Sequence, residues 1–239
     1  MSAWVAGILA NLAIAALATR ARALDRSGVL AAFGVGLLVW IGLGIKAFGL
    51  LVLFLAAGSL LTRLGFEQKA QQGIAQSVTG ARSAKEVLAK GWVPAVCAAW
   101  ALGVPATEGL ASLAMVASLA AALSDTSSTE VGKVWGENPF RLFPWGPVSP
   151  GTPGAVSAQG LGAGLLGAVF VALAGTALGL QSPSLVGWIA AVGFLANLAE
   201  SVLCSVLSIK KVPPGWVLNV FTSSFAACCS IIIGLKLGG

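Results

Sequence analysis

The sequence predicts an all-α fold, a polytopic transmembrane helical bundle with about seven or eight spans. Only 9% of its 239 residues are charged, against roughly 25% in an ordinary soluble domain. Hydrophobic residues make up 57% of the chain, and the mean hydropathy is +0.93. These residues gather in blocks of about 16 to 24, near the length of a helix that crosses a bilayer. A soluble globular enzyme is therefore excluded.

Eight apolar segments are candidate spans within a single integral-membrane domain that covers residues 1–239. The fourth segment is short, so an arrangement with seven spans stays open. In chain order the segments are 3–18, 28–45, 47–63, 92–104, 108–124, 158–180, 184–207 and 216–236.

Charge placement predicts the orientation of these spans. All Lys and Arg residues except Lys46 and Lys236 fall in alternate connections, namely 18–28, 63–92, 124–158 and 207–216. The positive-inside rule puts these four connections on the cytoplasmic or stromal face and the amino terminus outside. Basic residues follow the first span instead of preceding it, which argues against a signal peptide. We therefore expect a bacterial protein, or a chain that has already been trimmed.

Several residue types narrow the possible chemistry. The chain has no histidine, which removes the commonest general base and metal ligand. Four cysteines lie inside apolar segments without metal-ligand spacing, so we interpret them as small packing residues. The net charge of +6 mostly reflects topology and predicts no nucleic-acid partner.

The connection 124–158 begins with a polar stretch directly after a span. Residues 124–133 read Ser-Asp-Thr-Ser-Ser-Thr-Glu-Val-Gly-Lys, which places Asp125 and Glu130 at the membrane surface among hydroxyls. Magnesium takes such hard oxygen ligands when it also holds phosphates. A five-residue separation puts the two acids about 140° apart on a helix, so joint ligation requires a helix break or end. The alternative is that Asp125 only terminates the helix.

The same connection ends in a candidate phosphate cradle. Residues 150–157 read Pro-Gly-Thr-Pro-Gly-Ala-Val-Ser just before the next span. Gly151, Thr152, Gly154 and Ser157 thus lead into a helix amino terminus, whose free N–H groups attract anions. No Gly-Lys-Ser/Thr triplet follows, so this is not a Walker loop. Taken alone, the stretch is typical of an ordinary Pro-Gly turn.

Polar residues also occur inside the seventh span. Asn197, Glu200 and Ser201 lie at i, i+3 and i+4 on one helical face. An ionisable residue within a membrane is a functional-site hypothesis by default, and the alternative is a protonated or paired structural glutamate. Asn219, near the start of the last span, is a weaker case of the same kind.

Basic residues of the connection 63–92 form a third candidate group. Arg63, Lys69 and Arg82 offer cationic groups that clamp a polyphosphate or an anionic headgroup. A solvated basic loop on the inner face of the membrane explains the three residues nearly as well.

Together these motifs resemble the phytyl-phosphate kinases of plants and cyanobacteria, which belong to a wider family of integral-membrane proteins, many without assigned function. The similarity runs through residues 124–133, 150–157 and 196–201 and covers almost the whole chain in order. One departure precedes Asn219, where the family often carries Asn-Asn-Asp and this chain has Pro214-Gly215-Trp216. Acceptor choice or the number of metal ions depends on that difference.

The resemblance implies phosphoryl transfer from a nucleoside triphosphate, with CTP or UTP favoured, to phytyl monophosphate or a similar prenyl monophosphate. The product would be the diphosphate used in tocopherol biosynthesis. A phosphomonoester acceptor is already anionic near neutral pH, with a second pKa near 6. It therefore needs no strong base, which fits a chain without histidine.

We expect Mg²⁺ and the triphosphate on Asp125 and Glu130, supported by Thr126 and Lys133. The residues of the cradle would hold phosphate oxygens. The membrane-facing half, where the acceptor enters, would be lined by Asn197, Glu200 and Asn219, and the charge would be neutralised by Arg63, Lys69 and Arg82.

Two other functions remain open at this stage. A lipid cytidylyltransferase would use the same magnesium, CTP and lipid phosphate, but it would attack the α-phosphorus and release pyrophosphate. An ion-coupled transporter would place Glu200, Asn197 and Asn219 on an ion path. The short connections on the opposite face weigh against a transporter.

Overall fold

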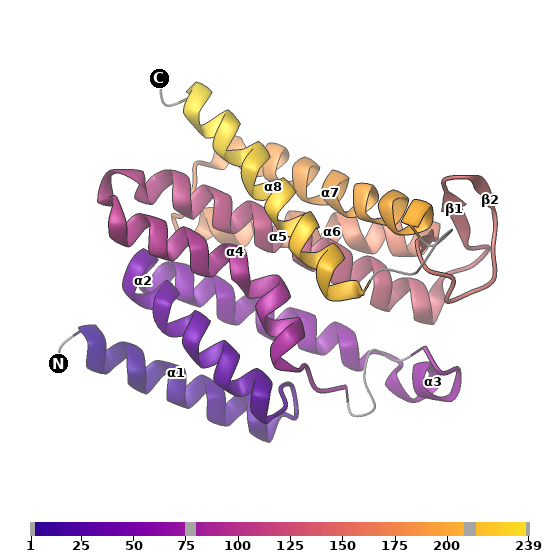
Figure 1. The fold of residues 1–239 in the computed structure, drawn as a ribbon, viewed down its shortest axis with the longest axis horizontal. Helices are drawn as coiled ribbons and strands as arrows, with labels where there is room; N and C mark the ends of the chain where they lie inside the picture. Colours follow the sequence, from indigo (N-terminus) through magenta and orange to yellow (C-terminus); the bar gives the residue numbers. More distant parts are fainter. Residues whose placement is uncertain (1–2, 75–79, 208–213, 238–239) are drawn as a thin grey trace.

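The computed structural model describes residues 3–74, 80–207 and 214–237, and most of them are helical (Figure 1). Two short 3-10 helices, Pro105–Thr107 and Pro183–Leu185, each lead directly into a longer helix. The helices are α1 (Ala3–Arg20), α2 (Arg26–Arg63), α3 (Phe66–Gln71), α4 (Ala84–Gly103), α5 (Glu108–Trp135), α6 (Ala158–Ala177), α7 (Val186–Leu207) and α8 (Gly215–Leu237). The predicted helical fold is confirmed, apart from a small sheet.

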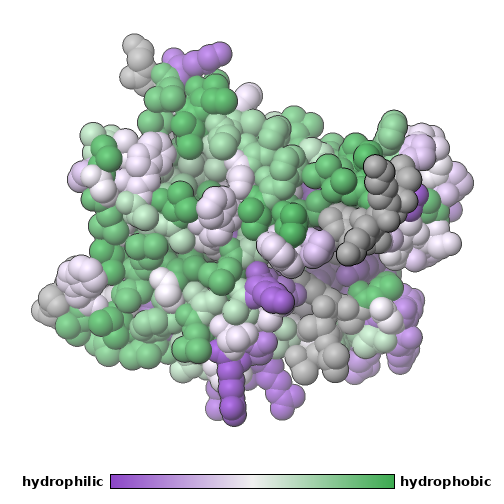
Figure 2. Space-filling model, in the orientation of Figure 1, coloured by the Kyte–Doolittle hydropathy of each residue, from purple (hydrophilic) through white to green (hydrophobic). Residues whose placement is uncertain are grey.

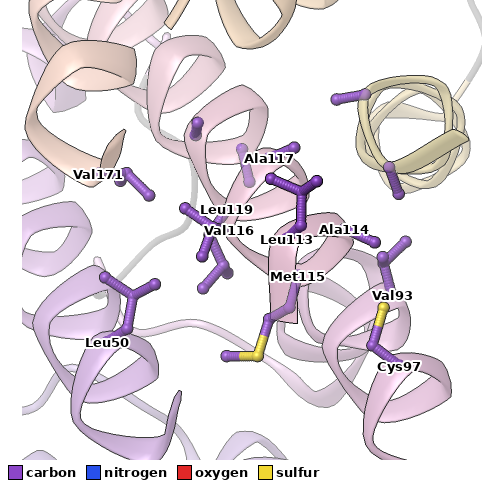
Figure 3. Packing of buried hydrophobic residues seen from close by; sticks show 14 of the residues in the cluster. Leu50, Val93, Cys97, Leu113, Ala114, Met115, Val116, Ala117, Leu119 and Val171 are labelled. Atoms are coloured by element: carbon purple, nitrogen blue, oxygen red, sulfur yellow. The ribbon is translucent and has the colours of Figure 1, made fainter. Parts of the chain in front are cut away.

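Helix α5 forms the centre of the bundle. It packs against α2, α4, α6, α7 and α8, and the side chains of residues 111–124 are all buried. Many of these residues are alanine or serine, which let neighbouring helices approach closely. Figure 3 shows Met115 and Leu119 of α5 among the buried residues around Leu50 of α2 and Val171 of α6.

Helix α2 contains a break that divides it into two arms. Gly44 has φ +79° and ψ −179°, a conformation that is essentially restricted to glycine. The chain reverses there, since the rings of Trp40 and Phe48 meet at 5.3 Å between centroids. The predicted segments 28–45 and 47–63 are therefore the two arms of one helical hairpin, visible in Figure 1.

Five helices of the described chain are long and apolar enough to cross a membrane. They cover 26–63, 105–135, 158–177, 183–207 and 215–236, and Trp4–Arg20 is a shorter apolar helix. Helix α4 is not among the five, because Glu86 and Lys90 fall in its first turns. The predicted count of seven to eight spans is thus not confirmed.

The polar motif after the fifth apolar segment is helical, contrary to the prediction of a connection over 124–158. Helix α5 continues to Trp135, so the connection begins at Gly136. Similarly, the predicted connection 63–92 contains α3 and the first turns of α4. In both places a helix extends beyond its apolar run because one face of the polar turns is still packed.

A small antiparallel sheet follows α5. Strand β1 (Phe140–Leu142) pairs with β2 (Trp145–Pro147) on one side and with β3 (Ala155–Val156) on the other. Five prolines between 139 and 153 keep this segment out of a helix. The sheet and α3 lie at one end of the bundle, while the start of α1 and the end of α8 lie at the other (Figure 1).

The outer surface is strongly apolar. Figure 2 shows hydrophobic side chains over most of the visible face, and Leu30, Leu60 and Leu166 are at least 70% exposed. Exposed apolar area on this scale is expected where lipid is the solvent. The cytoplasmic face stays a prediction, and its residues Lys210 and Lys211 lie outside the described part of the chain.

Candidate functional site

A polar cleft lies between α5, α6, α7 and the segment 150–157. It encloses about 1100 Å³, including space open to solvent. Eight of the residues predicted from sequence line it, namely Asp125, Lys133, Gly151, Thr152, Gly154, Ser157, Asn197 and Glu200. Residues separated by up to 75 positions in sequence thus converge on one space, which we call the polar cleft.

Asp125 faces the polar cleft with a lysine behind it. Its Oδ2 accepts a hydrogen bond of 2.9 Å from Nζ of Lys90, which also donates to the hydroxyl of Thr126 at 2.6 Å. The Asp125 side chain keeps 17% exposure. Asp125 therefore does not end the helix, as the alternative interpretation had it, because α5 continues for ten more residues.

Glu130 belongs to a different and more deeply buried cluster. Its carboxylate pairs with Nζ of Lys69 at 2.5 Å, and the two side chains are 3% and 1% exposed. Lys69 also donates to the carbonyl of Thr62 at 2.9 Å, and the guanidinium of Arg82 donates to the Thr62 hydroxyl at 3.2 Å. These residues hold α3, α2 and α5 together and are not among those that line the polar cleft.

Joint magnesium ligation by Asp125 and Glu130 is not favoured by this geometry. The required helix break is not present, because α5 is continuous through both residues. Each carboxylate is matched with its own lysine. Within the described residues no group of three or more Asp, Glu or Cys side chains is positioned to hold a metal. Asp125, beside the hydroxyls of Ser128 and Thr129 in the polar cleft, retains the hard-oxygen character that magnesium prefers.

The glycine turn at 149–155 forms one wall of the polar cleft. Gly151 and Gly154 have φ of +81° and +75°, and Thr152 donates through its hydroxyl to the carbonyl of Ser149 at 2.7 Å. A Cβ on Gly154 would lie 2.4 Å from the hydroxyl oxygen of Ser205, so α7 fixes the turn closely. Ile74 also lines the cleft, and its side chain would lie 3.0 Å from a Cβ added to Gly151.

The turn leads into the amino terminus of α6. Ser157 caps this helix, because its hydroxyl accepts a hydrogen bond of 3.2 Å from the N–H of Gly160. The first N–H groups of a helix lack intrahelical partners and attract anions. The stretch is a Pro-Gly turn that forms a wall of the cleft, and its role as a phosphate cradle stays a prediction.

The predicted polar face of α7 also lines the polar cleft. Asn197, Glu200 and Ser201 all reach it, which confirms that they share one helical face. Asn197 donates to the hydroxyls of Ser124 and Ser128 at 3.2 and 2.7 Å. Glu200 accepts a hydrogen bond of 2.5 Å from the hydroxyl of Thr222 in α8. These contacts join α7 to α5 and α8 around the cleft.

Like Glu130, Lys69 and Thr126, three further predicted residues do not line the polar cleft. Arg63 is exposed and lines a groove between α1 and α2. The amide of Asn219 donates to the carbonyl of Gly215 in its own helix at 3.0 Å. Arg82 is buried, and this burial lowers the pKa of its guanidinium while Glu86, Glu130 and Asp125 oppose the shift; an arginine remains charged nonetheless.

The sequence reasoning missed Lys90 and Thr222 as members of the site. Lys90 contacts Asp125 and Thr126, and Thr222 contacts Glu200. Lys90 carried a usable signal, because it stands directly before a long apolar run. An ionisable residue at the edge of a membrane span suggests a functional role. Thr222 carried none, since a single hydroxyl in a membrane helix commonly bonds its own backbone.

Fold and site together define a helical integral membrane protein with a polar cleft at one end of the bundle. The chain belongs to the family described as Integral membrane protein DUF92, whose match covers residues 9–214. This finding confirms the kind of family that the motifs indicated.

Curated relatives come from cyanobacteria, plants and archaea. The chain is 33% identical over 211 residues to "Uncharacterized membrane protein sll0875" of Synechocystis sp., covering 87% of this chain and 81% of the relative. It is 32% identical over 205 residues to "Protein VTE6, chloroplastic" of Arabidopsis thaliana, covering 84% of this chain and 62% of that protein. It therefore spans less than two thirds of the plant relative.

An archaeal relative is covered almost completely. The chain is 30% identical over 226 residues to "Uncharacterized membrane protein MJ0933" of Methanocaldococcus jannaschii, covering 95% of this chain and 92% of the relative. No solved structure matches the chain. The predicted membrane localisation agrees with the family and with the chloroplastic and cyanobacterial relatives.

Proposed function

We propose that this protein is a prenyl-phosphate kinase, which transfers the terminal phosphoryl group of a nucleoside triphosphate to a lipid prenyl monophosphate. The observation that carries the proposal is the polar cleft, where Asp125, Lys133 and the glycine turn face the polar side chains of α7. An accessible carboxylate, a cation and helix-terminal N–H groups are the parts that phosphoryl transfer requires. The similarity to the plant protein VTE6 supports the same assignment.

The reaction balances without an acid or base of histidine type. A phosphate oxygen of the acceptor attacks the γ-phosphorus and forms a P–O–P bond. The bond between the γ-phosphorus and its bridging oxygen breaks, and the nucleoside diphosphate leaves with that electron pair. Such transfer depends mainly on positioning and charge neutralisation.

The described residues divide these tasks. Asp125, assisted by the hydroxyls of Ser128 and Thr129, would hold Mg²⁺, which would supply positive charge to offset that of the phosphates. Lys133 lines the polar cleft and is half-buried, and it would contact the triphosphate. The glycine turn and the amino terminus of α6 would hold further phosphate oxygens. Lys90 positions Asp125 through the hydrogen bond described above.

The finer assignments follow the resemblance of the motifs. We propose CTP or UTP as the donor and phytyl monophosphate as the acceptor, with geranylgeranyl and farnesyl monophosphates as shorter or less saturated alternatives. The three acceptors share one headgroup, so the polar cleft itself does not distinguish them.

A turnover assay on detergent-purified protein tests the proposal. It contains phytyl monophosphate, Mg²⁺ and each of the four ribonucleoside triphosphates separately, and both products are identified by mass spectrometry. We expect phytyl diphosphate and a nucleoside diphosphate, a loss of turnover in Asp125→Asn, and a loss on removal of Mg²⁺ by EDTA. The melting temperature of Asp125→Asn serves as the control for folding. A nucleotidyl-lipid with pyrophosphate would instead identify a cytidylyltransferase.

A further inference from the structure

A second cavity lies beside the polar cleft and differs from it in chemistry. It encloses about 700 Å³, including space open to solvent, between α1, the two arms of α2 and α4. Its walls are almost entirely apolar, with Phe33, Phe48 and Phe54 among them, and its charged lining residues are Arg82, Glu86 and Lys90. We call this space the tail cavity. Ligand cavities in proteins commonly combine mostly apolar walls with a few polar groups.

The charged residues gather at one end of the tail cavity. Arg82 lies beside Gly28 and Gly58, which are near the two ends of α2. The opposite end lies near the Gly44 reversal, where a Cβ on Gly36 would touch Asn11 and Phe48. The cavity therefore matches an amphipathic ligand that has an anionic head and a long apolar body. The Glu86 carboxylate accepts hydrogen bonds of 2.7 and 3.1 Å from the backbone and hydroxyl of Ser83, which ties it to the start of α4.

Lys90 connects the tail cavity with the polar cleft. It lines the tail cavity, and its Nζ bonds Asp125, which lines the polar cleft. One ion pair thus forms the wall between the two spaces. The three N–H groups of Lys90 are taken by Asp125, Thr126 and the carbonyl of Ala122. A phosphate at this end of the cavity would therefore lie beside the ion pair and next to the carboxylate that we place at the triphosphate.

The tail cavity also has a route to the surrounding lipid. Ile14, Ala18, Val52 and Leu55 line both this cavity and the groove between α1 and α2 that ends at Arg63. Helix α1 packs mainly against α2 and lies at the edge of the bundle (Figure 1). An isoprenoid chain can therefore pass from the bilayer to the cavity beside α1.

We propose that the tail cavity binds the isoprenoid chain of the acceptor, with Arg82 and Lys90 at its phosphate end and the Asn11–Gly36–Phe48 contact at its far end. This inference rests on the proposed function for the identity of the headgroup. It assigns chain-length selection to α1, α2 and α4, none of which carries the glycine turn or the polar face of α7.

Two neighbouring alanines in α1 provide a matched test. Ala15 lines the tail cavity, whereas Ala16 is exposed on the outer surface of the helix and does not line it. Ala15→Phe should lower kcat/KM for geranylgeranyl monophosphate about tenfold or more relative to geranyl monophosphate, because a filled pocket discriminates strongly against added length. The KM for the nucleotide should stay unchanged, and Ala16→Phe should behave as the unmodified protein.

A binding experiment without nucleotide separates this proposal from the proposed function. The probe is geranylgeranyl monophosphate with a diazirine at the far end of its chain, photolysed on the unmodified protein and mapped by mass spectrometry. We expect labelling near Asn11, Gly36 or Phe48, and less of it in Ala15→Phe. Such labelling without turnover for any nucleotide would reject the kinase and keep the tail cavity. Turnover combined with labelling of α8, or with no labelling, would reject the tail cavity alone.

Discussion

Lys69 and Glu130 form the more deeply buried of the two ion pairs in the described chain. Burying a charge is unfavourable unless its partner and further hydrogen bonds are present. The Thr62 carbonyl supplies one such bond to Lys69. The pair connects the short helix α3 to the polar end of α5, so it stabilises the position of α3.

Removing one member of this pair should therefore destabilise the protein. Glu130→Gln leaves the ammonium of Lys69 without a counter-charge, and we expect a loss of about 3–5 kcal/mol in the free energy of unfolding. Denaturant unfolding of the detergent-solubilised protein measures this loss of stability. The double variant Lys69→Met, Glu130→Leu should recover most of the loss, because it removes both charges. If Glu130→Gln keeps its stability but loses turnover, Glu130 takes part in the chemistry that the resemblance implies.

Helix α5 illustrates which parts of the site could be predicted from the sequence. The acids and hydroxyls at 124–133 were identified from their types, yet a connection was predicted there because the apolar segment ends at Ser124. Packing against α6 and α7 keeps the segment helical instead. The membrane helices themselves were predictable, since their apolar runs are long enough to be recognised from hydropathy alone.

The pairing of charges was not predictable in the same way. Lys69 and Glu130 are 61 positions apart, and Lys90 and Asp125 are 35 apart. No local periodicity reports which cation a carboxylate meets after folding. The glycine turn and the polar face of α7 were found because each is a contiguous motif, whereas Arg63 was selected for its charge alone and lies elsewhere.

A substitution in the glycine turn tests whether this turn takes part in nucleotide binding. Gly154→Ala forces a Cβ toward Ser205 and places an L side chain at φ +75°, so the turn must shift. We expect kcat/KM for the nucleotide to fall by at least about tenfold, since small misplacements of positioning groups are costly. Gly146→Ala in β2, where an added Cβ meets nothing within 4 Å, should leave steady-state kinetics unchanged. Equal kinetics for the two variants would remove the turn from nucleotide binding.

The reversal in α2 can be tested with two glycines of one helix. Gly44→Ala places a Cβ in a backbone region that only glycine adopts readily, which costs about 1–3 kcal/mol. Gly49→Ala, at a helical position with open space around the added Cβ, should be neutral or slightly stabilising. Thermal unfolding followed by circular dichroism compares the two variants. Matching melting temperatures would mean that the arms of α2 do not depend on the conformation of Gly44.

At the scale of the whole molecule, the ends of the bundle differ in composition. The sheet, α3 and the polar cleft share one end, while the reversal in α2 and the short connection 104–107 lie at the other (Figure 1). The positive-inside rule assigns the first end to the cytoplasm. With that assignment a water-soluble nucleotide reaches the cleft directly, and the lipid approaches from the side.

Cysteine accessibility tests this orientation. In a protein whose four native cysteines are replaced, Trp145→Cys in β2 and Ala106→Cys before α5 introduce thiols at exposed positions on opposite ends. A membrane-impermeant maleimide should label Ala106→Cys in intact cells and Trp145→Cys only in inverted vesicles. The reverse pattern would place the polar cleft outside the cell, where nucleoside triphosphates are scarce.

The contact between Ile74 and the Gly151 turn bears on how fast the polar cleft admits a ligand. At this point one aliphatic side chain borders the opening, opposite a glycine that offers no side chain of its own. Rotation of such a side chain takes picoseconds to nanoseconds, whereas shifting a packed helix takes microseconds or longer. Rotation of Ile74 is therefore too fast to limit turnover, and under the proposed function a slow step would belong to chemistry or to release of the product.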